Sequence, residues 1–186
     1  MKRVLLGLGS NKDFLGLSSI ELLRKVCYEL AIFLKNPVFS SIYITRAMYV
    51  KDQNDFYNMA VLGYIEDNVK PHDLLKKIND IESKYGRDRS KEIRFGPRSV
   101  DIDIELFGDE TVNTPDLQIP HVRMEERAFV LIPSLEILND SADVKIKEKY
   151  TQCLSKIDLT DEANCVEKVV DSADFISLQA VDTNER

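Results

Sequence analysis

The chain has 186 residues, of which 44% are hydrophobic, and this is enough for one well-formed core. Its net charge of -7 argues against general nucleic-acid binding, because proteins that bind phosphodiester backbones usually carry a basic excess. It has no run of eighteen apolar residues and no signal-peptide pattern at its start, so we expect a cytoplasmic protein without a membrane partner.

The beginning of the chain predicts a strand followed by a helix. Residues 3–8 are rich in Val and Leu, which is typical of a buried central strand. Apolar residues then recur at helical spacing from Ser18 to Leu34, and Ser18 with Glu21 has the pattern of a capping box. The Asn-Pro pair that follows predicts the end of this helix.

The next segment predicts two strands and a second helix. Residues 38–45 and 56–64 are β-branched and aromatic, so we expect antiparallel neighbours joined by a long polar loop. Pro71 suits the first position of a helix that Gly86 should end.

The second half of the chain is less strongly patterned. Residues 100–107 alternate as a strand does, and a short helix is expected over residues 124–132. Beyond Asp140 the sequence is more polar, with a weak helix over residues 146–157 and a strand over residues 165–170.

The order of these elements is β-α-β-β-α-β, with further pieces at the end. It predicts a ferredoxin-like α+β sandwich, in which helices cover one face of an antiparallel sheet. We expect a single domain over residues 1–160 and a partly mobile C-terminal extension over residues 161–186.

The strongest chemical signal is the pair Asp101 and Asp103. Side chains two apart on a strand project to the same face, so these carboxylates share one patch while Ile102 and Ile104 point to the other face. Their mutual repulsion favours a cation, and Mg²⁺ suits them because it takes its remaining ligands from water and phosphates. Taken alone, such a pair is more often a solvated strand face.

A basic loop precedes the acidic pair. Six basic residues and only two acidic ones lie between Lys84 and Arg98. Guanidinium groups that grip phosphate oxygens would therefore stand next to carboxylates that hold a metal. Phosphoryl transfer rests mainly on positioning and charge stabilisation, so this context favours a nucleotide and metal site.

Other patterns of ligand binding are weak. Lys12 replaces the third glycine of a dinucleotide fingerprint, and no GxxxxGK[ST] loop occurs. His72 is expected at the surface, whereas His121 suits a phosphate contact and a structural role equally well. The three cysteines fit neither a disulfide framework nor a metal site.

Four short motifs in this order resemble 6-hydroxymethyl-7,8-dihydropterin pyrophosphokinases. They are Gly9-Ser10-Asn11, the segment from Asp55 to Asn58, Gly96-Pro97-Arg98-x-x-Asp101-x-Asp103, and Pro120-His121. The resemblance covers roughly residues 4–137, and the central block is its most specific part.

The resemblance implies that residues 1–160 are a single pyrophosphokinase domain with the fold expected above. It implies transfer of diphosphate from ATP to the 6-hydroxymethyl group of 7,8-dihydropterin, giving AMP and the pterin diphosphate in folate biosynthesis. It also implies two Mg²⁺ ions as cofactors, ATP as co-substrate, and a monomer whose partners are small molecules.

The resemblance also implies roles for individual residues. Catalysis would involve Arg87, Arg98, Asp101 and Asp103, and the two aspartates would bind the metal ions. ATP would contact Asn79, Glu82, Arg89, Arg94, Arg98, Ile104, His121 and Arg127. The pterin would contact Thr45, Phe56, Asn58, Phe95 and Phe129, between the rings of Phe129 and Phe56.

Three points stay open at this level. One alternative is a non-catalytic nucleotide- or metal-binding module of the same fold. The presence of residues for binding both the metal and the acceptor substrate counts against it. Another is an RNA-binding ferredoxin-like domain, against which the acidic charge and the lack of exposed strand aromatics count. The base for the pterin hydroxyl is Asp103, a metal-bound water, or no dedicated group at all.

Overall fold

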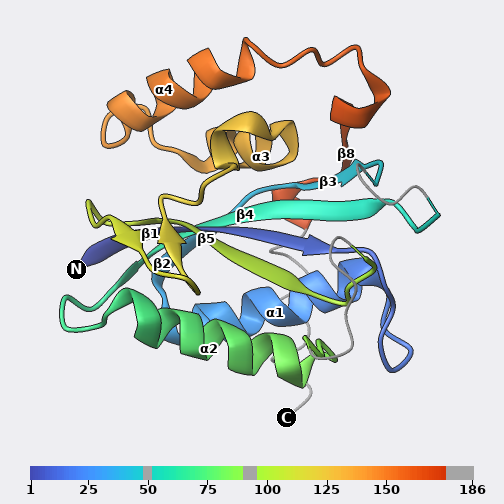
Figure 1. The fold of residues 1–186 in the computed structure, drawn as a ribbon, viewed down its shortest axis with the longest axis horizontal. Coiled ribbons are helices and arrows are strands. Elements are labelled where there is room, and N and C mark those ends of the chain that lie inside the picture. Colours follow the sequence, from blue (N-terminus) through green and yellow to red (C-terminus); the bar gives the residue numbers. More distant parts are fainter. Residues whose placement is uncertain (48–51, 90–95, 175–186) are drawn as a thin grey trace.

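The computed structural model describes residues 1–47, 52–89 and 96–174, and an antiparallel sheet lies at its centre (Figure 1). The strand order is β5-β1-β4-β3-β8, and β2 also pairs with β4. The strands are β1 (Lys2–Ser10), β2 (Lys35–Phe39), β3 (Ile42–Thr45), β4 (Phe56–Ile65), β5 (Asp101–Phe107) and β8 (Val166–Val170). The predicted α+β class with an antiparallel sheet is confirmed.

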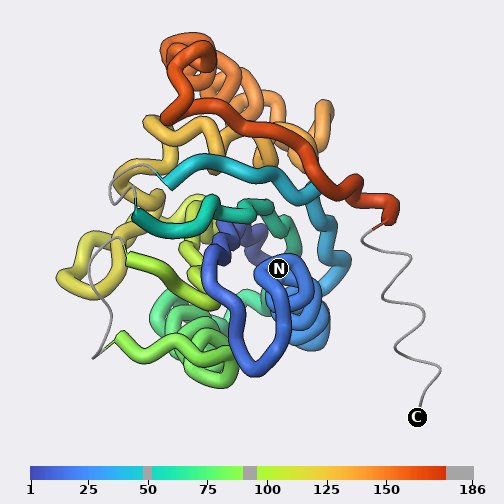
Figure 2. Tube along the Cα trace, turned by 90° about the vertical axis from the view of Figure 1, so that its right-hand side faces the viewer, coloured from blue at the N-terminus to red at the C-terminus, as the bar shows by residue number. Residues whose placement is uncertain are grey.

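Helices cover both faces of this sheet, so the expectation that they cover one face is wrong. The helices α1 (Ser19–Phe33) and α2 (Pro71–Lys84) lie on one face, and α3 (Ala128–Ile137) and α4 (Val144–Leu154) lie on the other (Figures 1 and 2). The protein therefore has three layers, and the sheet separates two hydrophobic cores.

The first strand shows why a second helical layer is needed. Val4 and Leu6 of β1 are buried in the core beneath α1 and α2, whereas Leu5 between them is buried in the core beneath α3 and α4. Alternate residues of a strand point to opposite faces, so a strand that is apolar throughout must be covered on both sides.

The ends of α1 and α2 follow their sequence signals. The N–H of Ser18 donates to the Glu21 carboxylate at 2.8 Å and the N–H of Glu21 donates to the Ser18 hydroxyl at 3.4 Å, which confirms the capping box. The chain leaves α2 at Gly86, whose φ of 88° lies in the left-handed region. A Cβ at Gly86 would lie 2.3 Å from the ring of Phe14, so this contact also requires glycine.

Two predicted elements are divided in the structure. The strand expected over residues 38–45 becomes β2 and β3, because Ser40 between them uses its hydroxyl to accept the N–H of Ala60 at 2.8 Å. The helix expected over residues 124–132 becomes a 3-10 turn, η1 (Met124–Glu126), followed by α3, because the backbone at their junction is extended.

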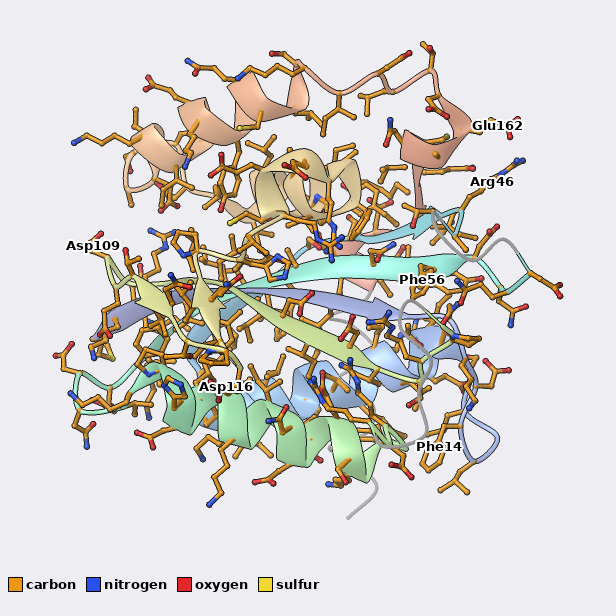
Figure 3. All side chains as sticks on the ribbon, in the orientation of Figure 1. Phe14, Arg46, Phe56, Asp109, Asp116 and Glu162 are labelled. Carbon is orange, nitrogen blue, oxygen red and sulfur yellow. The ribbon has the colours of Figure 1, made fainter. Side chains whose placement is uncertain are left out.

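The segment after α4 returns to the sheet. After a second 3-10 turn, η2 (Glu162–Asn164), β8 pairs with β3 and confirms the strand predicted over residues 165–170. The guanidinium of Arg46 contacts the Glu162 carboxylate, and Figure 3 shows these two side chains together at the end of β3. β3 therefore has a hydrogen-bonded neighbour on each side.

Two short strands, β6 (Val112–Asn113) and β7 (Gln118–Ile119), form a separate ribbon after β5. None of the helices over the described ranges combines the length and the apolar character needed to span a bilayer.

Candidate active site

A pocket of about 260 Å³ opens at the end of β1, where β4 and β5 flank that strand. Residues from β1, β3, β4, β5 and α3 and from neighbouring loops line it. Among the residues expected to contact substrates, it brings together Thr45, Phe56, Asn58, Arg87, Arg89, Arg98, Asp101, Asp103, His121, Arg127 and Phe129.

Strand alternation places the acidic pair as predicted. Asp101 and Asp103 line the pocket on the α3 face of the sheet, whereas Ile102 and Ile104 are buried in the core beneath α1 and α2. The apolar residues of β5 thus hold the strand against the core beneath α1 and α2, while its carboxylates face the cavity.

Two glycines of β1 form the floor beside these carboxylates. Gly9 pairs with Asp101 and Gly7 pairs with Asp103 across the two strands. A Cβ at Gly9 would touch Oδ1 of Asn58 at 3.4 Å, so glycine leaves this part of the pocket floor open. The Gly-x-Gly pattern therefore shapes a cavity without a Rossmann turn.

Asp101 is held by two arginines. Arg87 donates to its Oδ1 and Arg98 donates to its Oδ2. Burial alone would raise the pKa of Asp101, but the charges of Arg98 and Arg87 outweigh it and keep the pKa below its usual range. Asp101 is therefore ionised at neutral pH.

Asp103 differs from Asp101 in its surroundings. Within the described ranges it has no hydrogen bond or ion pair of its own. Burial and the neighbouring charge of Asp101 raise the pKa of Asp103 from 3.8 to about 7. Two adjacent carboxylates, one of them unpaired, fit a hard divalent cation such as Mg²⁺, whose charge would favour ionised Asp103.

We expect Asp103 to make the metal-free protein less stable as the pH rises from about 4 to about 7. Its pKa in the folded protein is about 7 and its usual value is 3.8, so folding favours the protonated form. That contribution is fully present below the unfolded pKa and is lost as the pH rises through the folded pKa. Thermal midpoints measured with a chelator across this range, in wild type and Asp103→Asn, isolate the contribution. Equal pH dependence in both proteins would contradict the pKa assigned to Asp103.

Glu82 of α2 connects the basic loop to β5. Its Oε1 accepts the N–H of Ile102 at 2.8 Å and contacts Arg87, and its Oε2 accepts from Arg89 at 2.7 Å. Burial raises the pKa of Glu82, although Arg87 and Arg89 oppose the shift. Only 2% of the Glu82 side chain is exposed. This buried carboxylate therefore fixes the positions of two arginines that line the pocket.

The other side of the pocket is aromatic and neutral. The Asn58 amide donates to the Thr45 hydroxyl at 2.8 Å, and Asn58 is 5% exposed. Phe56 lies at the start of β4, where Figure 3 shows its ring, and Phe129 lies at the start of α3. The Arg98 guanidinium is 6.0 Å from the Phe56 ring centroid. A flat polar heterocycle suits such a site, since its faces would contact rings and its edge would contact amides.

Asn11 joins three loops around the pocket, a role that sequence reasoning missed. Its side chain donates to Gln53 Oε1 at 3.1 Å and to the Asn54 carbonyl at 3.0 Å, and accepts the N–H of Arg98 at 2.8 Å. The Gly-Ser-Asn turn was the signal in the sequence, but the partners of Asn11 are distant along the chain.

Glu105 is a second residue that the sequence analysis missed. It continues the alternation of Asp101 and Asp103, lines the pocket and is 1% exposed. Burial raises the pKa of Glu105 well above its usual value, Asp103 adds to the shift, and Arg127 opposes it. The two-residue spacing along β5 was the available signal.

The remaining candidates lie away from the pocket wall. Asn79 accepts from Arg89 at 3.2 Å on the outer surface of α2, and the side chain of Ile104 is in the core on the opposite face. His72 is at the surface as predicted, with 48% of its side chain exposed. Arg94 and Phe95 lie outside the described residues.

Comparison with known proteins gives a consistent result. A family model described as 7,8-dihydro-6-hydroxymethylpterin-pyrophosphokinase (HPPK) matches residues 5–139. A 2-amino-4-hydroxy-6-hydroxymethyldihydropteridine pyrophosphokinase of Bacillus subtilis is 47% identical over 98 residues, covering 53% of this chain and 56% of that protein. The protein of the same name in Aquifex aeolicus is 35% identical over 137 residues, covering 74% of this chain and 81% of that protein.

The fold also resembles that of a solved structure. Plasmodium falciparum HPPK-DHPS superposes with a TM-score of 0.58 at 15% sequence identity, covering 87% of this chain and 46% of that chain. At this identity the likeness concerns the fold alone. The chain thus spans about half the length of the Plasmodium protein, and the matched part of the Bacillus protein is 56% of its length.

Proposed function

Because the chain belongs to the 7,8-dihydro-6-hydroxymethylpterin-pyrophosphokinase family, we propose that it transfers diphosphate from ATP to the 6-hydroxymethyl group of 7,8-dihydropterin, giving AMP and the pterin diphosphate in folate biosynthesis. The observation that carries this proposal is a single pocket that joins paired carboxylates and arginines to an aromatic and amide-lined side. A diphosphotransferase needs both sides in one cavity, one for each substrate.

The charged side of the pocket would take MgATP. Asp101 and Asp103 would hold two Mg²⁺ ions, which supply charge neutralisation to the phosphates. Phosphate oxygens would be contacted by Arg98, Arg127 and His121. Arg87 and Arg89 line the same pocket and are held by hydrogen bonds to Glu82.

The aromatic side would take the pterin. The rings of Phe56 and Phe129 would stack on the two faces of the heterocycle, and Asn58 with Thr45 would contact its polar edge. This arrangement would orient the hydroxymethyl group toward the carboxylates.

In the reaction, the hydroxymethyl oxygen would attack the β-phosphorus of ATP. A bond forms between this oxygen and the β-phosphorus, and the bond from the β-phosphorus to the oxygen bridging it to the α-phosphorus breaks, so that AMP leaves. The hydroxyl proton is lost in the process. Because Asp103 would be occupied as a ligand of Mg²⁺, the proton would pass to solvent water without a dedicated base.

The catalytic unit would be residues 1–160, with residues 161–186 as an extension whose described part contributes β8. We propose that the protein works as a monomer in the cytoplasm, in keeping with the expectation from its sequence.

Product analysis tests the proposed function directly. Purified protein with ATP and Mg²⁺ should release AMP only when hydroxymethyl-dihydropterin is added, and equal amounts of AMP and pterin diphosphate should form. Nucleotide binding without any transfer would instead support the non-catalytic module.

The acceptor side gives a separate prediction. Asn58→Ala should weaken pterin binding by about 1 to 3 kcal/mol, because a polar edge of the ligand loses its partner, and should leave nucleotide binding nearly unchanged. Calorimetric titration of each ligand measures both effects. Thr45→Val removes the acceptor of the Asn58 amide and keeps the side-chain shape, so it separates loss of orientation from loss of the amide. Equal weakening of both ligands by Asn58→Ala would mean that Asn58 is structural.

A further inference from the structure

Glu105 is a buried carboxylate of the pocket without a role in the scheme above, and we propose that it positions His121 and Arg127 for contact with the phosphates of the nucleotide. This inference rests on the proposed function, because it assumes that the charged side of the pocket receives a polyphosphate. Glu105 itself would not touch the substrate, so it is a positioning residue.

The backbone brings Glu105 and His121 together. The N–H of His121 donates to the carbonyl of Glu105 at 3.2 Å, which attaches the loop after β7 to the edge of β5. Oε2 of Glu105 then lies 3.8 Å from Nδ1 of His121, with 1% of the Glu105 side chain and 22% of the His121 side chain exposed. This distance is too long for a hydrogen bond, but a small ring rotation or one bridging water would close it.

Three polar atoms at this place need partners. Oε2 of Glu105, Nδ1 of His121 and Nε of Arg127 are each buried and each without a hydrogen bond to the parts of the chain that the structure describes. All three residues line the same pocket. A carboxylate acceptor between an imidazole and a guanidinium can satisfy both, and a group buried without a partner is costly enough that such a set calls for an explanation.

The floor of the pocket is shaped to hold this carboxylate. A Cβ at Gly7 would lie 2.7 Å from Oε1 of Glu105, so the glycine makes the space that Glu105 fills. The Arg127 guanidinium lies 5.4 Å from the Phe129 ring centroid, which places it between the two sides of the pocket. By orienting Arg127, Glu105 would therefore fix a guanidinium that lies where the charged side of the pocket meets its aromatic side.

When Nδ1–H of His121 donates to Glu105, Nε2 faces the nucleotide. The negative charges of Glu105 and of the polyphosphate then favour the imidazolium, whose Nε2–H donates to a phosphate oxygen. Without Glu105, the imidazole has no fixed orientation and its two neutral tautomers become comparable. The same change leaves Arg127 free to adopt other rotamers, so nucleotide binding would lose preorganisation.

The experiment compares Glu105→Leu and Glu105→Gln with wild type. Calorimetry with a non-hydrolysable ATP analogue and Mg²⁺ should show about tenfold weaker binding for Glu105→Leu, as expected when a residue that orients a ligand-binding histidine is removed. Glu105→Gln should bind within a few-fold of wild type, because an amide oxygen can still accept. Pterin affinity should be unchanged in both. The thermal midpoint of Glu105→Leu should rise, since a poorly paired buried carboxylate is replaced by an apolar side chain.

A second readout does not depend on nucleotide at all. The chain has two histidines, so imidazole nitrogen resonances of His121 can be compared with those of exposed His72 in the same spectrum. Wild type and Glu105→Gln should show one neutral tautomer for His121, and Glu105→Leu should show values averaged between the two neutral tautomers. The resonances of His72, whose Nε2 lies 3.3 Å from the Thr114 hydroxyl, should be the same in all three proteins.

Asp143→Asn provides the matched control, because Asp143 is also a carboxylate with 1% exposure but pairs with Arg3 outside the pocket. It should change stability without changing nucleotide affinity. Unchanged His121 resonances and unchanged nucleotide affinity in Glu105→Leu would overturn the proposal, as would weakening of both ligands with a lower thermal midpoint. If wild type itself did not bind the analogue, the proposed function would fail, while the His121 resonances would still report whether Glu105 sets the ring.

Discussion

Asp103→Ala is expected to lower turnover by at least about a hundredfold, the order found when an electrostatic contact to a reacting group is removed. The same substitution should raise the thermal midpoint of the metal-free protein. Asp103 is partly buried next to the charge of Asp101 and has no ion pair within the described ranges, so its removal relieves repulsion. Steady-state assays and thermal melts with a chelator measure the two effects.

Asp101→Ala provides the comparison that separates metal binding from stability. Turnover should fall similarly, but the thermal midpoint should also fall, because Arg87 and Arg98 lose the carboxylate they share. Asp109→Ala is the control: this exposed carboxylate is in the turn after the same strand, and Figure 3 places it far from Phe56. Near-normal turnover in folded Asp103→Ala would refute the metal site and the phosphoryl-transfer mechanism that depends on it.

Glu82→Ala is expected to destabilise the protein by about 3 kcal/mol, because a buried ion pair and the acceptor of a buried backbone N–H are lost together. Arg87 is 7% exposed and would lose its ion pair with Glu82, and the N–H of Ile102 would lose its acceptor. Nucleotide binding should weaken as well, since Arg87 and Arg89 both rest on this carboxylate. Chemical denaturation followed by calorimetry on the folded variant measures each effect.

Asp80→Ala on the same helix separates this effect from a general loss of charge on α2. Asp80 is exposed, so its removal should change neither stability nor binding appreciably. Glu82→Gln should fall between wild type and Glu82→Ala, because the amide oxygen can still accept the N–H of Ile102. A stability of Glu82→Ala equal to that of Asp80→Ala would show that Glu82 does not support the loop.

The sequence was most informative where local rules decide the structure. The capping box of Ser18 and Glu21 predicted the start of α1, and Pro71 with Gly86 predicted the limits of α2. Alternation along β5 placed Asp101 and Asp103 on one face. Each of these features depends on residues within a few positions of each other, so a single sequence contains the necessary information.

The sequence was less informative where distant contacts decide. The break between β2 and β3 depends on the Ser40 hydroxyl meeting Ala60, and the break before α3 depends on an extended Arg127 at the pocket. The second helical layer could be inferred only from the apolar character of both faces of β1. Glu105 was overlooked because its importance comes from His121 and Arg127, which approach it through the loop after β7.

The strand order also constrains how the protein is made. β1 is the first strand synthesised, yet it is an inner strand whose neighbours, β4 and β5, end at Ile65 and Phe107. A nascent chain that stops before β5 therefore contains the glycines of the pocket floor without the carboxylates that cover them. Because such long-range pairing must wait for distant segments, the binding site is among the last parts of the molecule to be completed during translation.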